Sequence, residues 1–288
     1  MKKTLRVLTL LLATCLFASV ALADVVNTAA DIVFVVDESG SMSTEHAWLD
    51  GMVASLDSKL TAAGVTSTTY SLIGYGNSNI VPHTLLNAGT TSEFYAATDN
   101  LVVWGGTEDG YDAIDYGFSE LTFQANAVKN FILITDEDRD IYDSSVTYNT
   151  LKTLFTGANG GLLNTVVNLD MKNNSNPNRL IGSSFSNGYL ADGSGGFTLT
   201  DAATAFNGYG TTKSDYYDLA LATEGAAWDL NLLRAGGDEA VSFTNAFIDV
   251  KVKEIQQYDP PTVPEPSTWV LMGMGLVGLF IYRKKRTS

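Results

Sequence analysis

The sequence predicts an α/β fold, a doubly wound and mostly parallel sheet flanked by helices on both faces. Segments with strand character alternate along the chain with segments of helical periodicity, which is typical of parallel sheets. The strand segments Asp31–Val36 and Phe131–Ile134 are mostly apolar runs, as expected for strands that are covered on both faces. The chain shows no internal repeat and no heptad pattern, so neither a solenoid nor a coiled coil is predicted.

The first helix is predicted over residues 45–63, because apolar residues recur every four positions from Trp48 to Leu60. Ser43 or Thr44 can cap its start. The other elements predicted in this half are strand 68–76, an edge strand over 80–86 that contains Pro82, helix 91–103, a helix from about Asp109, and strand 127–140.

A helix near 146–155 and a strand over 162–169 follow, and then the alternation stops. Residues 171–213 are rich in Asn, Gly and Ser and have little periodicity, so they are predicted to be a loop-rich insertion. Alternation returns with a helix over 216–223, a short strand over 226–230 and a last helix over 238–255. The predicted organisation is a short lead (24–30), one domain (31–255) and a proline-rich linker (256–266).

Residues 1–23 have the features of a secretory signal peptide. A basic start and an apolar stretch are followed by small residues at Ala21 and Ala23. We expect cleavage before Asp24 and export of the chain. Cys15 is the only cysteine and would leave with the signal, so the exported protein would contain no disulfide.

The last residues form a second signal. Pro264-Glu265-Pro266 precedes an uncharged stretch, 267–282, which is just short of a comfortable membrane span, and four basic residues follow it. These three parts in order resemble the PEP-CTERM sorting signal of Gram-negative bacteria. The resemblance implies an inner-membrane anchor over 267–288 as a short transmembrane helix, processing by an exosortase-type membrane enzyme, and then a place on the cell surface or in the extracellular matrix. A plain membrane anchor is the alternative.

The charge of the chain is strongly acidic and unevenly distributed. The formal net charge is −15, and seven of the 17 basic residues lie in the two terminal segments, whereas all 32 acidic residues lie between them. Such a body repels polyanions, so the sequence excludes DNA or RNA as partners. Cations and basic partners suit it better.

Three predicted loops at the carboxyl edge of the sheet carry oxygen-bearing side chains. The first loop has the D-x-S-x-S pattern of Asp37, Ser39 and Ser41, the second contains Thr107 after two glycines, and the third begins at Asp136. Because ligands of open α/β folds bind beyond the carboxyl ends of the strands, we expect these loops to meet. Two carboxylates and three hydroxyls, with no histidine or cysteine, suit a hard divalent cation: Mg²⁺, Mn²⁺ or Ca²⁺.

The D-x-S-x-S motif after an apolar strand, the Gly-Gly-Thr loop and an aspartate after a later apolar strand resemble the von Willebrand factor A domain and its metal-ion-dependent adhesion site. The resemblance runs from about residue 31 to residue 255 and implies a Rossmann-like fold. It implies that Ser39, Ser41 and Thr107 would bind the cation directly. Asp37 and Asp136 would bind it directly or through water, and an acidic group of a partner would supply the remaining position.

Four of these five residues also have a simpler interpretation. The D-x-S-x-S segment could be an ordinary strand-to-helix turn with a helix cap, and Thr107 could cap the helix that follows it. Glu108, Glu137 and Asp138 are expected to form a solvated acidic rim, and His46 is expected to face solvent. Glu137 and Asp138 also stand where a glycine is common in the family.

The sequence favours a binding module over an enzyme. It contains neither the G-x-S-x-G elbow of hydrolases nor a phosphate-binding P-loop. We therefore expect an exported, non-enzymatic module that recognises a protein or matrix ligand through the cation. One alternative is a structural component of an exopolysaccharide or biofilm matrix with a stabilising Ca²⁺. A metal-assisted hydrolase with Glu108 or Glu137 as its base is the other alternative.

Overall fold

The computed structural model describes residues 27–77, 81–157, 160–175 and 178–259. The predicted signal peptide and the predicted apolar C-terminal helix lie outside these residues. Among the residues that are described, no helix is both long enough and apolar enough to cross a membrane.

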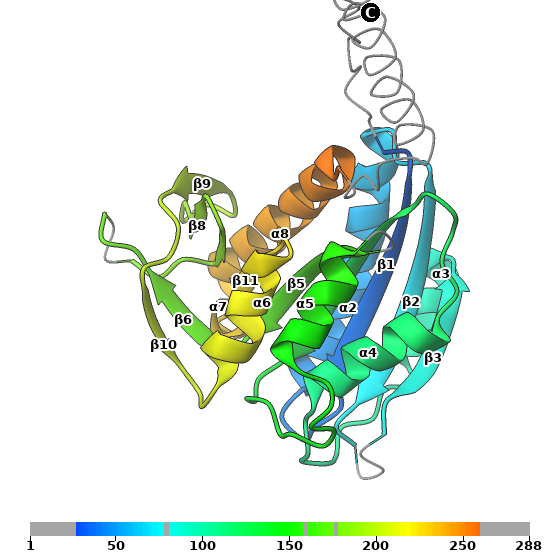
Figure 1. The fold of residues 1–288 in the computed structure, drawn as a ribbon. Coiled ribbons are helices and arrows are strands. Elements are labelled where there is room, and N and C mark those ends of the chain that lie inside the picture. Colours follow the sequence, from blue (N-terminus) through cyan, green and yellow to red (C-terminus); the bar gives the residue numbers. More distant parts are fainter. Residues whose placement is uncertain (1–26, 78–80, 158–159, 176–177, 260–288) are drawn as a thin grey trace, which may run out of the picture.

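A nine-stranded sheet forms the centre of the described part (Figure 1). Its five central strands run parallel in the order β2-β1-β4-β5-β11, whereas β3 at one edge and β7, β8 and β9 at the other pair antiparallel. The predicted α/β fold is therefore confirmed, with parallel pairing confined to the centre of the sheet. The strands are β1 (Ala29–Asp37), β2 (Ser67–Tyr75), β3 (His83–Gly89), β4 (Val128–Thr135), β5 (Gly161–Val167), β7 (Gly182–Ser184), β8 (Gly188–Ala191), β9 (Phe197–Thr200) and β11 (Ala226–Asp229).

Helices cover both faces of the sheet, and each face has its own apolar core (Figure 1). The alternation within β1 shows why: Ile32, Phe34 and Val36 point to one core, and Val33 and Val35 point to the other. Helices α2, α3, α7 and α8 pack on the first face, and α4, α5 and α6 pack on the second. The helices are α2 (Ser43–Ala62), α3 (Thr91–Thr98), α4 (Gly110–Glu120), α5 (Tyr148–Thr156), the π-helix η1 (Lys213–Tyr217), α6 (Asp218–Ala222), α7 (Leu230–Arg234) and α8 (Gly237–Gln257).

The pairing of β1 places the loops of interest together. Val36 is in register with Gly74 of β2 on one side and with Ile134 of β4 on the other. Because the three strands are parallel, their carboxyl ends reach the same edge of the sheet. The loops that begin at Asp37 and Asp136 therefore start side by side.

Segment 171–213 differs from the loop-rich prediction. Strands β7 to β9 extend the main sheet, and β10 (Ala205–Gly208) pairs with β6 (Leu169–Lys172) in a second, two-stranded sheet. Each strand has only three or four residues, too few for an alternating pattern to be recognised in the sequence. Tertiary packing supports them instead: the Tyr189 ring stacks on Trp228 with centroids 5.2 Å apart.

Two further local predictions were wrong, and one short helix was not predicted. Neither Ser43 nor Thr44 caps α2, because Met42 stands at the N-cap position and no side chain caps the helix. Helix α3 ends at Thr98, and the chain then turns so that the backbone N–H of Val102 reaches the carboxylate of Glu38. The short helix α7 was not predicted, since five residues are too few to show helical periodicity.

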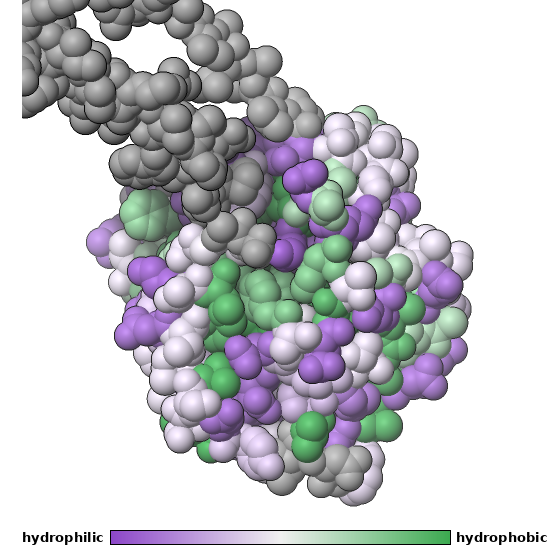
Figure 2. Space-filling view, turned by 45° about the vertical axis from the view of Figure 1, so that its right-hand side comes forward, coloured by the Kyte–Doolittle hydropathy of each residue, from purple (hydrophilic) through white to green (hydrophobic). Residues whose placement is uncertain are grey.

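Hydrophobic side chains (green in Figure 2) gather near the middle of one face, with hydrophilic ones around them.

Candidate metal centre and ligand pocket

Asp37 is the last residue of β1, and its side chain is fully buried. Its two carboxylate oxygens accept hydrogen bonds from the backbone N–H of Ser39 (2.7 Å) and from the hydroxyl of Thr135 (2.7 Å). Burial raises the pKa of Asp37 to about 6, although both hydrogen bonds oppose this shift. A carboxylate that is removed from water in this way is stabilised by a cation next to it.

Two serines and a second aspartate continue from this point. The hydroxyl oxygens of Ser39 and Ser41 lie 3.3 Å apart, and Ser41 donates a hydrogen bond of 2.9 Å to Oδ1 of Asp136. Ser39 and Asp136 are buried, and Ser41 is exposed. The structure thus joins four of the five predicted ligands, Asp37, Ser39, Ser41 and Asp136, into one chain of contacts.

Thr107 is not part of this chain of contacts. Its hydroxyl donates to the carbonyl of the neighbouring Gly106 at 2.8 Å, and no contact among the described residues links it to the other four. The loop nevertheless approaches closely, because Gly105 has a φ of 142° and a Cβ there would lie 2.2 Å from the carbonyl oxygen of Gly76. Thr107 does not cap α4 either, since Asp109 takes that position.

Glu108, one residue further on, faces the site instead. It is only 4% exposed, so it does not belong to a solvated rim. Burial raises the pKa of Glu108 to about 8, and the negative charges of Asp37, Asp140 and Glu137 add to the shift. Sequence reasoning treated this residue as surface because its neighbours Thr107 and Asp109 carry the recognisable loop and cap signals.

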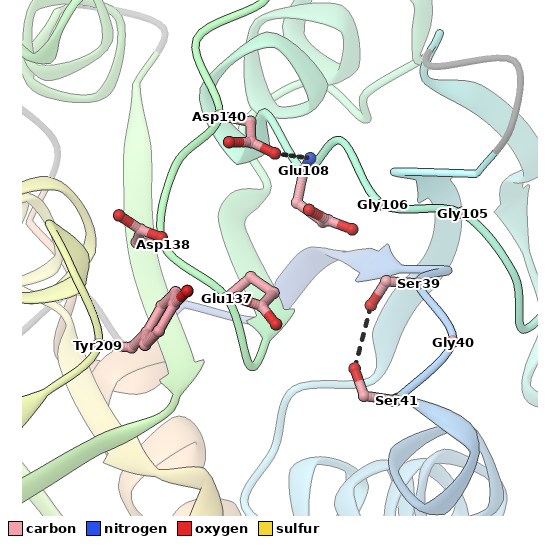
Figure 3. A pocket seen from close by; sticks show the side chains of 10 residues that line it. All are labelled: Ser39, Gly40, Ser41, Gly105, Gly106, Glu108, Glu137, Asp138, Asp140 and Tyr209. Carbon is pink, nitrogen blue, oxygen red and sulfur yellow. Dashed lines mark hydrogen bonds between the residues drawn. The ribbon is translucent and has the colours of Figure 1, made fainter.

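A pocket of about 330 Å³ opens between these loops (Figure 3). The serines of the first loop stand on one side, and acidic residues stand on the other. The side chain of Glu108 points into the space between them. The pocket is lined by Ser39, Gly40, Ser41, Gly105, Gly106, Glu108, Glu137, Asp138, Asp140 and Tyr209.

Arg234, at the end of α7, is a site residue that the sequence analysis missed. Its guanidinium pairs with Oδ2 of Asp136 (2.9 Å) and with the fully buried carboxylate of Glu45 (2.7 Å), and it also bonds the carbonyl of Ser41 (3.2 Å). Burial alone would lower the pKa of Arg234, but the bonds to Glu45 and Asp136 hold it above its ordinary value. This arginine fixes the orientation of Asp136. No local motif marks it, because its partners are nearly 100 and 190 residues away in sequence.

Two side chains near the site hold its loops. Glu38 is fully buried, and its carboxylate accepts hydrogen bonds from the backbone N–H of Val102 (3.0 Å) and from the amide of Asn77 (2.7 Å). His46 is half-buried rather than solvent-facing, and its Nε2 lies 2.9 Å from the carbonyl oxygen of Asp37. Both contacts tie neighbouring loops to the end of β1.

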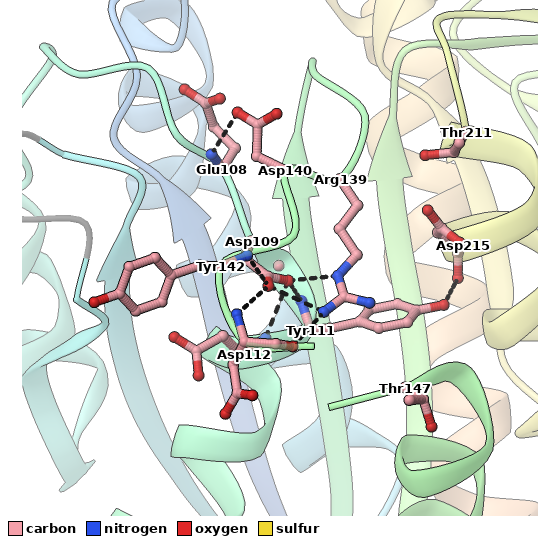
Figure 4. A network of polar contacts seen from close by, with 12 residues as sticks. Glu108, Asp109, Tyr111, Asp112, Arg139, Asp140, Tyr142, Thr147, Thr211 and Asp215 are labelled. Carbon is pink, nitrogen blue, oxygen red and sulfur yellow. Dashed lines mark hydrogen bonds and ion pairs between the residues drawn. The ribbon is translucent and has the colours of Figure 1, made fainter. Parts of the chain in front are cut away.

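A buried ion pair anchors the acidic side of the pocket (Figure 4). The carboxylate of Asp109 accepts hydrogen bonds from Nε of Arg139 (2.6 Å) and from the backbone N–H groups of Tyr142 (2.9 Å) and Asp143 (3.3 Å). The guanidinium of Arg139 also lies 4.3 Å from the centre of the Tyr111 ring. The start of α4 and the loop after β4 are thereby held against each other.

The joined residues fit a hard cation in their chemistry. Asp37 and Asp136 offer carboxylates, and Ser39 and Ser41 offer hydroxyls, without any nitrogen or sulfur ligand. In the part of the chain that the structure describes, no three His, Cys, Asp or Glu side chains are arranged to hold a metal ion. A cation here would therefore depend on the serine hydroxyls as well as on the carboxylates.

A helix-flanked α/β sheet with an oxygen-lined pocket at the carboxyl ends of its strands has its pocket where open α/β folds bind their ligands. Residues 31–159 match the von Willebrand factor type A domain, and all five predicted ligands lie within the matched segment. Residues 262–286 match the PEP-CTERM protein-sorting motif. Both predicted resemblances are therefore confirmed as family matches of these two segments, the first over residues 31–159 rather than as far as residue 255. A comparison with curated proteins found no match.

Solved structures provide further similarities. Proximal thread matrix protein 1 from the mussel byssus is 16% identical with a TM-score of 0.40, over 50% of this chain and 37% of that protein. An aerotolerance-related membrane protein from Bacteroides fragilis is 14% identical with a TM-score of 0.45, over 80% of this chain and 100% of that chain. The domain of the type V pili tip protein Mfa5 from Porphyromonas gingivalis is 20% identical with a TM-score of 0.31, over 40% of each chain. This chain thus spans little more than a third of the mussel protein, and at these identities the likeness concerns the fold alone.

Proposed function

We propose that this protein is an exported, non-enzymatic binding module that holds an acidic group of a protein or matrix ligand through a divalent cation. Asp37, Ser39, Ser41 and Asp136 would hold the cation, which we expect to be Mg²⁺ or Mn²⁺, or else Ca²⁺. Thr107 is the fifth proposed ligand, and its hydroxyl would have to turn away from Gly106 to reach the ion. The cation would supply the positive charge that attracts the acidic group of the ligand.

One observation carries this proposal: the chain of contacts from Asp37 through Ser39 and Ser41 to Asp136, at the side of an open pocket. Buried carboxylates are stable only with a compensating charge or hydrogen bonds. The second oxygen of Asp136 already pairs with Arg234, so its first oxygen is held on the side of Ser41. The protein's own contacts thus prearrange the oxygen atoms that a cation would need.

Isothermal titration calorimetry tests the metal site. Mg²⁺, Mn²⁺ and Ca²⁺ would be titrated into the full chain, purified in detergent, and into a Ser39→Ala variant. We expect saturable binding near one site and at least about a tenfold loss in the variant, since one ligand is removed. Ser55→Ala is the matched control, because Ser55 is exposed on α2 and bonds only Gly51 within its own helix. Failure of all three ions to bind the unmodified chain would overturn the proposal.

The sorting motif supports the exported role. The PEP-CTERM match over 262–286 marks a protein that is exported and processed at the membrane. We propose that an exosortase-type enzyme processes the chain while its C-terminal apolar segment holds it in the inner membrane, and that the domain then reaches the cell surface or the extracellular matrix. A Glu265→Ala variant followed by cell fractionation tests this step. We expect the variant to remain unprocessed in the membrane fraction, and normal release of the variant would contradict the proposal.

A further inference from the structure

The side of the pocket opposite the serines is built from three separate segments. Glu108 precedes α4, Glu137, Asp138 and Asp140 follow β4, and Tyr209 follows β10 (Figure 3). We call these five residues the acidic wall.

The segment that contains Tyr209 is held in place by a contact with the acidic wall itself. The backbone N–H and the hydroxyl of Thr211 donate to the carboxylate of Asp138 at 3.1 and 3.4 Å. Segment 171–213 thereby completes the pocket, because Tyr209 belongs to it.

Glu108 is the most deeply buried residue of the acidic wall. It is only 4% exposed, and its carboxylate points into the pocket. Among the described residues, no N–H group donates to its oxygens; its hydrogen-bonding neighbour is the carboxyl group of Asp140, and the charges of Asp37 and Glu137 are also near. A deeply placed carboxyl group whose hydrogen-bonding neighbour is another acid is rare in folded proteins, since most buried carboxylates are paired with an N–H or hydroxyl donor. When Glu108 and Asp140 are both ionised, they need a hydrogen-bond donor between them, and a positively charged donor suits the surrounding negative charge best.

The shape of the pocket selects a large cation rather than a second metal ion. In the described part of the chain, no three acidic, His or Cys side chains approach closely enough to hold a metal ion. The pocket has a volume of about 330 Å³, and the Tyr209 side chain is exposed at its side (57%). Carboxylates spread around such a space, with an aromatic ring beside them, suit a guanidinium or ammonium group, which can bond several oxygens and lie over the ring.

We propose that the acidic wall binds the guanidinium or ammonium group of an arginine or lysine side chain on a protein partner. Ser39 and Ser41 line the same pocket, so a partner segment could place this basic group beside the acidic group that the proposed cation would hold. The inference extends the proposed function by naming a second feature of the partner. The acidic wall itself does not require the metal.

A titration with small probes tests this site on the full chain, purified in detergent with EDTA present. Binding of Nα-acetyl-arginine amide would be followed by ligand-observed NMR, with the neutral, nearly isosteric Nα-acetyl-citrulline amide as the matched probe. We expect saturable binding of the arginine probe only. Glu108→Gln should weaken it about tenfold to a hundredfold, because a charge-assisted hydrogen bond is lost. Tyr209→Leu should weaken it about twofold to fivefold through loss of the ring.

Glu120→Gln is the charge control, because Glu120 is exposed at the far end of α4 and its loss changes the net charge equally. Equal weakening by Glu120→Gln and Glu108→Gln would overturn the inference, as would equal binding of the citrulline probe or no binding at all. Tighter binding of spermidine than of the arginine probe would overturn the proposal that the partner is a protein, because it would indicate a polyamine ligand. Tyr209 is exposed, so its variant tests the wall even if Glu108→Gln lowers the melting temperature. Calorimetry with Mg²⁺ separates the two proposals. Binding of Mg²⁺ without binding of the arginine probe would overturn only the acidic-wall proposal. Binding of the arginine probe without binding of Mg²⁺ would overturn only the metal-site proposal.

Discussion

Glu108 and Asp109 are neighbours in the sequence and both are buried, yet their surroundings are opposite (Figures 3 and 4). The carboxylate of Asp109 accepts two bonds from the guanidinium of Arg139 and further bonds from backbone N–H groups. The carboxyl group of Glu108 has the carboxyl group of Asp140 as its hydrogen-bonding neighbour, and the negative charges of Asp37 and Glu137 also act on it. Within one turn of chain, Asp109 is thus a carboxylate balanced by a cation, whereas Glu108 lies among acidic groups that favour its protonated form.

This difference separates a structural role from a functional one. A balanced buried charge holds elements together, and here it joins α4 to the loop after β4. A buried acid without a positive partner lowers the stability of the free protein once it is ionised, and such groups mark candidate ligand sites. The following predictions test the comparison, beginning with the largest expected effect.

Asp109→Asn should destabilise the fold strongly. The amide cannot compensate the charge of Arg139, whose side chain is only 7% exposed, so a buried cation is left without its partner. We expect the free energy of unfolding to fall by about 3 to 5 kcal/mol, as measured by denaturant unfolding. The double variant Asp109→Asn, Arg139→Met should recover part of this loss because no charge then remains buried. A loss below about 1 kcal/mol in the single variant would contradict a structural role for the pair.

Lys251 of α8 is a third buried ionisable side chain, and it lies on the face of the sheet opposite to α4. It is fully buried, and it bonds the carboxylate of Glu254 (2.5 Å) and the side chain of Asn164. Burial lowers the pKa of Lys251 to about 8, although Glu254 opposes the shift. Because the folded-state pKa is depressed, the resulting stability is fully present above the unfolded pKa of 10.5 and is lost as the pH falls through 8.

Denaturant unfolding between pH 7 and pH 10.5, with Lys251→Met beside the unmodified chain, measures this effect. We expect the unmodified chain to gain up to about 3 kcal/mol relative to the variant as the pH rises over this range. Parallel pH profiles for the two proteins would mean that the buried lysine keeps its ordinary pKa.

Glu108→Gln should have the smallest effect, and in the opposite direction to Asp109→Asn. Above the raised pKa of about 8, Glu108 is ionised and repels Asp140, whereas an amide can donate to it, so the variant should be more stable in this pH range in the presence of EDTA. We expect a gain of about 1 kcal/mol in the free energy of unfolding, because water in the pocket screens part of the repulsion. Destabilisation of the same size as in Asp109→Asn would show that Glu108 is balanced by a partner after all.

The sequence predicted those parts of the fold that depend on long, regular patterns. The apolar runs of β1 and β4 and the four-residue recurrence in α2 were recognised because a buried strand or helix face needs many apolar residues in a row or in register. Strands β7 to β9 were missed because pairing and contacts such as that between Tyr189 and Trp228, rather than a local pattern, hold them. Parallel pairing between strands then brought Asp37 and Asp136 to the same edge, as expected.

The candidate site was predictable only where a motif marks it. The D-x-S-x-S pattern identified Asp37, Ser39 and Ser41 as neighbours, and the structure joins them with Asp136. Arg234 could not be identified from the sequence, because its ion pairs with Glu45 and Asp136 depend on where α7 ends in the folded structure. The sequence also could not show that the hydroxyl of Thr107 bonds Gly106, because a single side-chain rotation decides this.

The hydrogen bonds of Asn27 place the two ends of the described domain together, which decides the direction in which a pulling force would act on it. Its side-chain amide bonds the carbonyls of Ile255 and Tyr258, so the chain enters and leaves the described domain at one end of the sheet. The pocket lies at the other end, nine residues of β1 or about 30 Å away. A ligand pulling at the pocket against a tether at Tyr258 would load β1 along its own axis. All the hydrogen bonds of its two parallel ladders would then resist together in shear, instead of opening one after another as in a zipper.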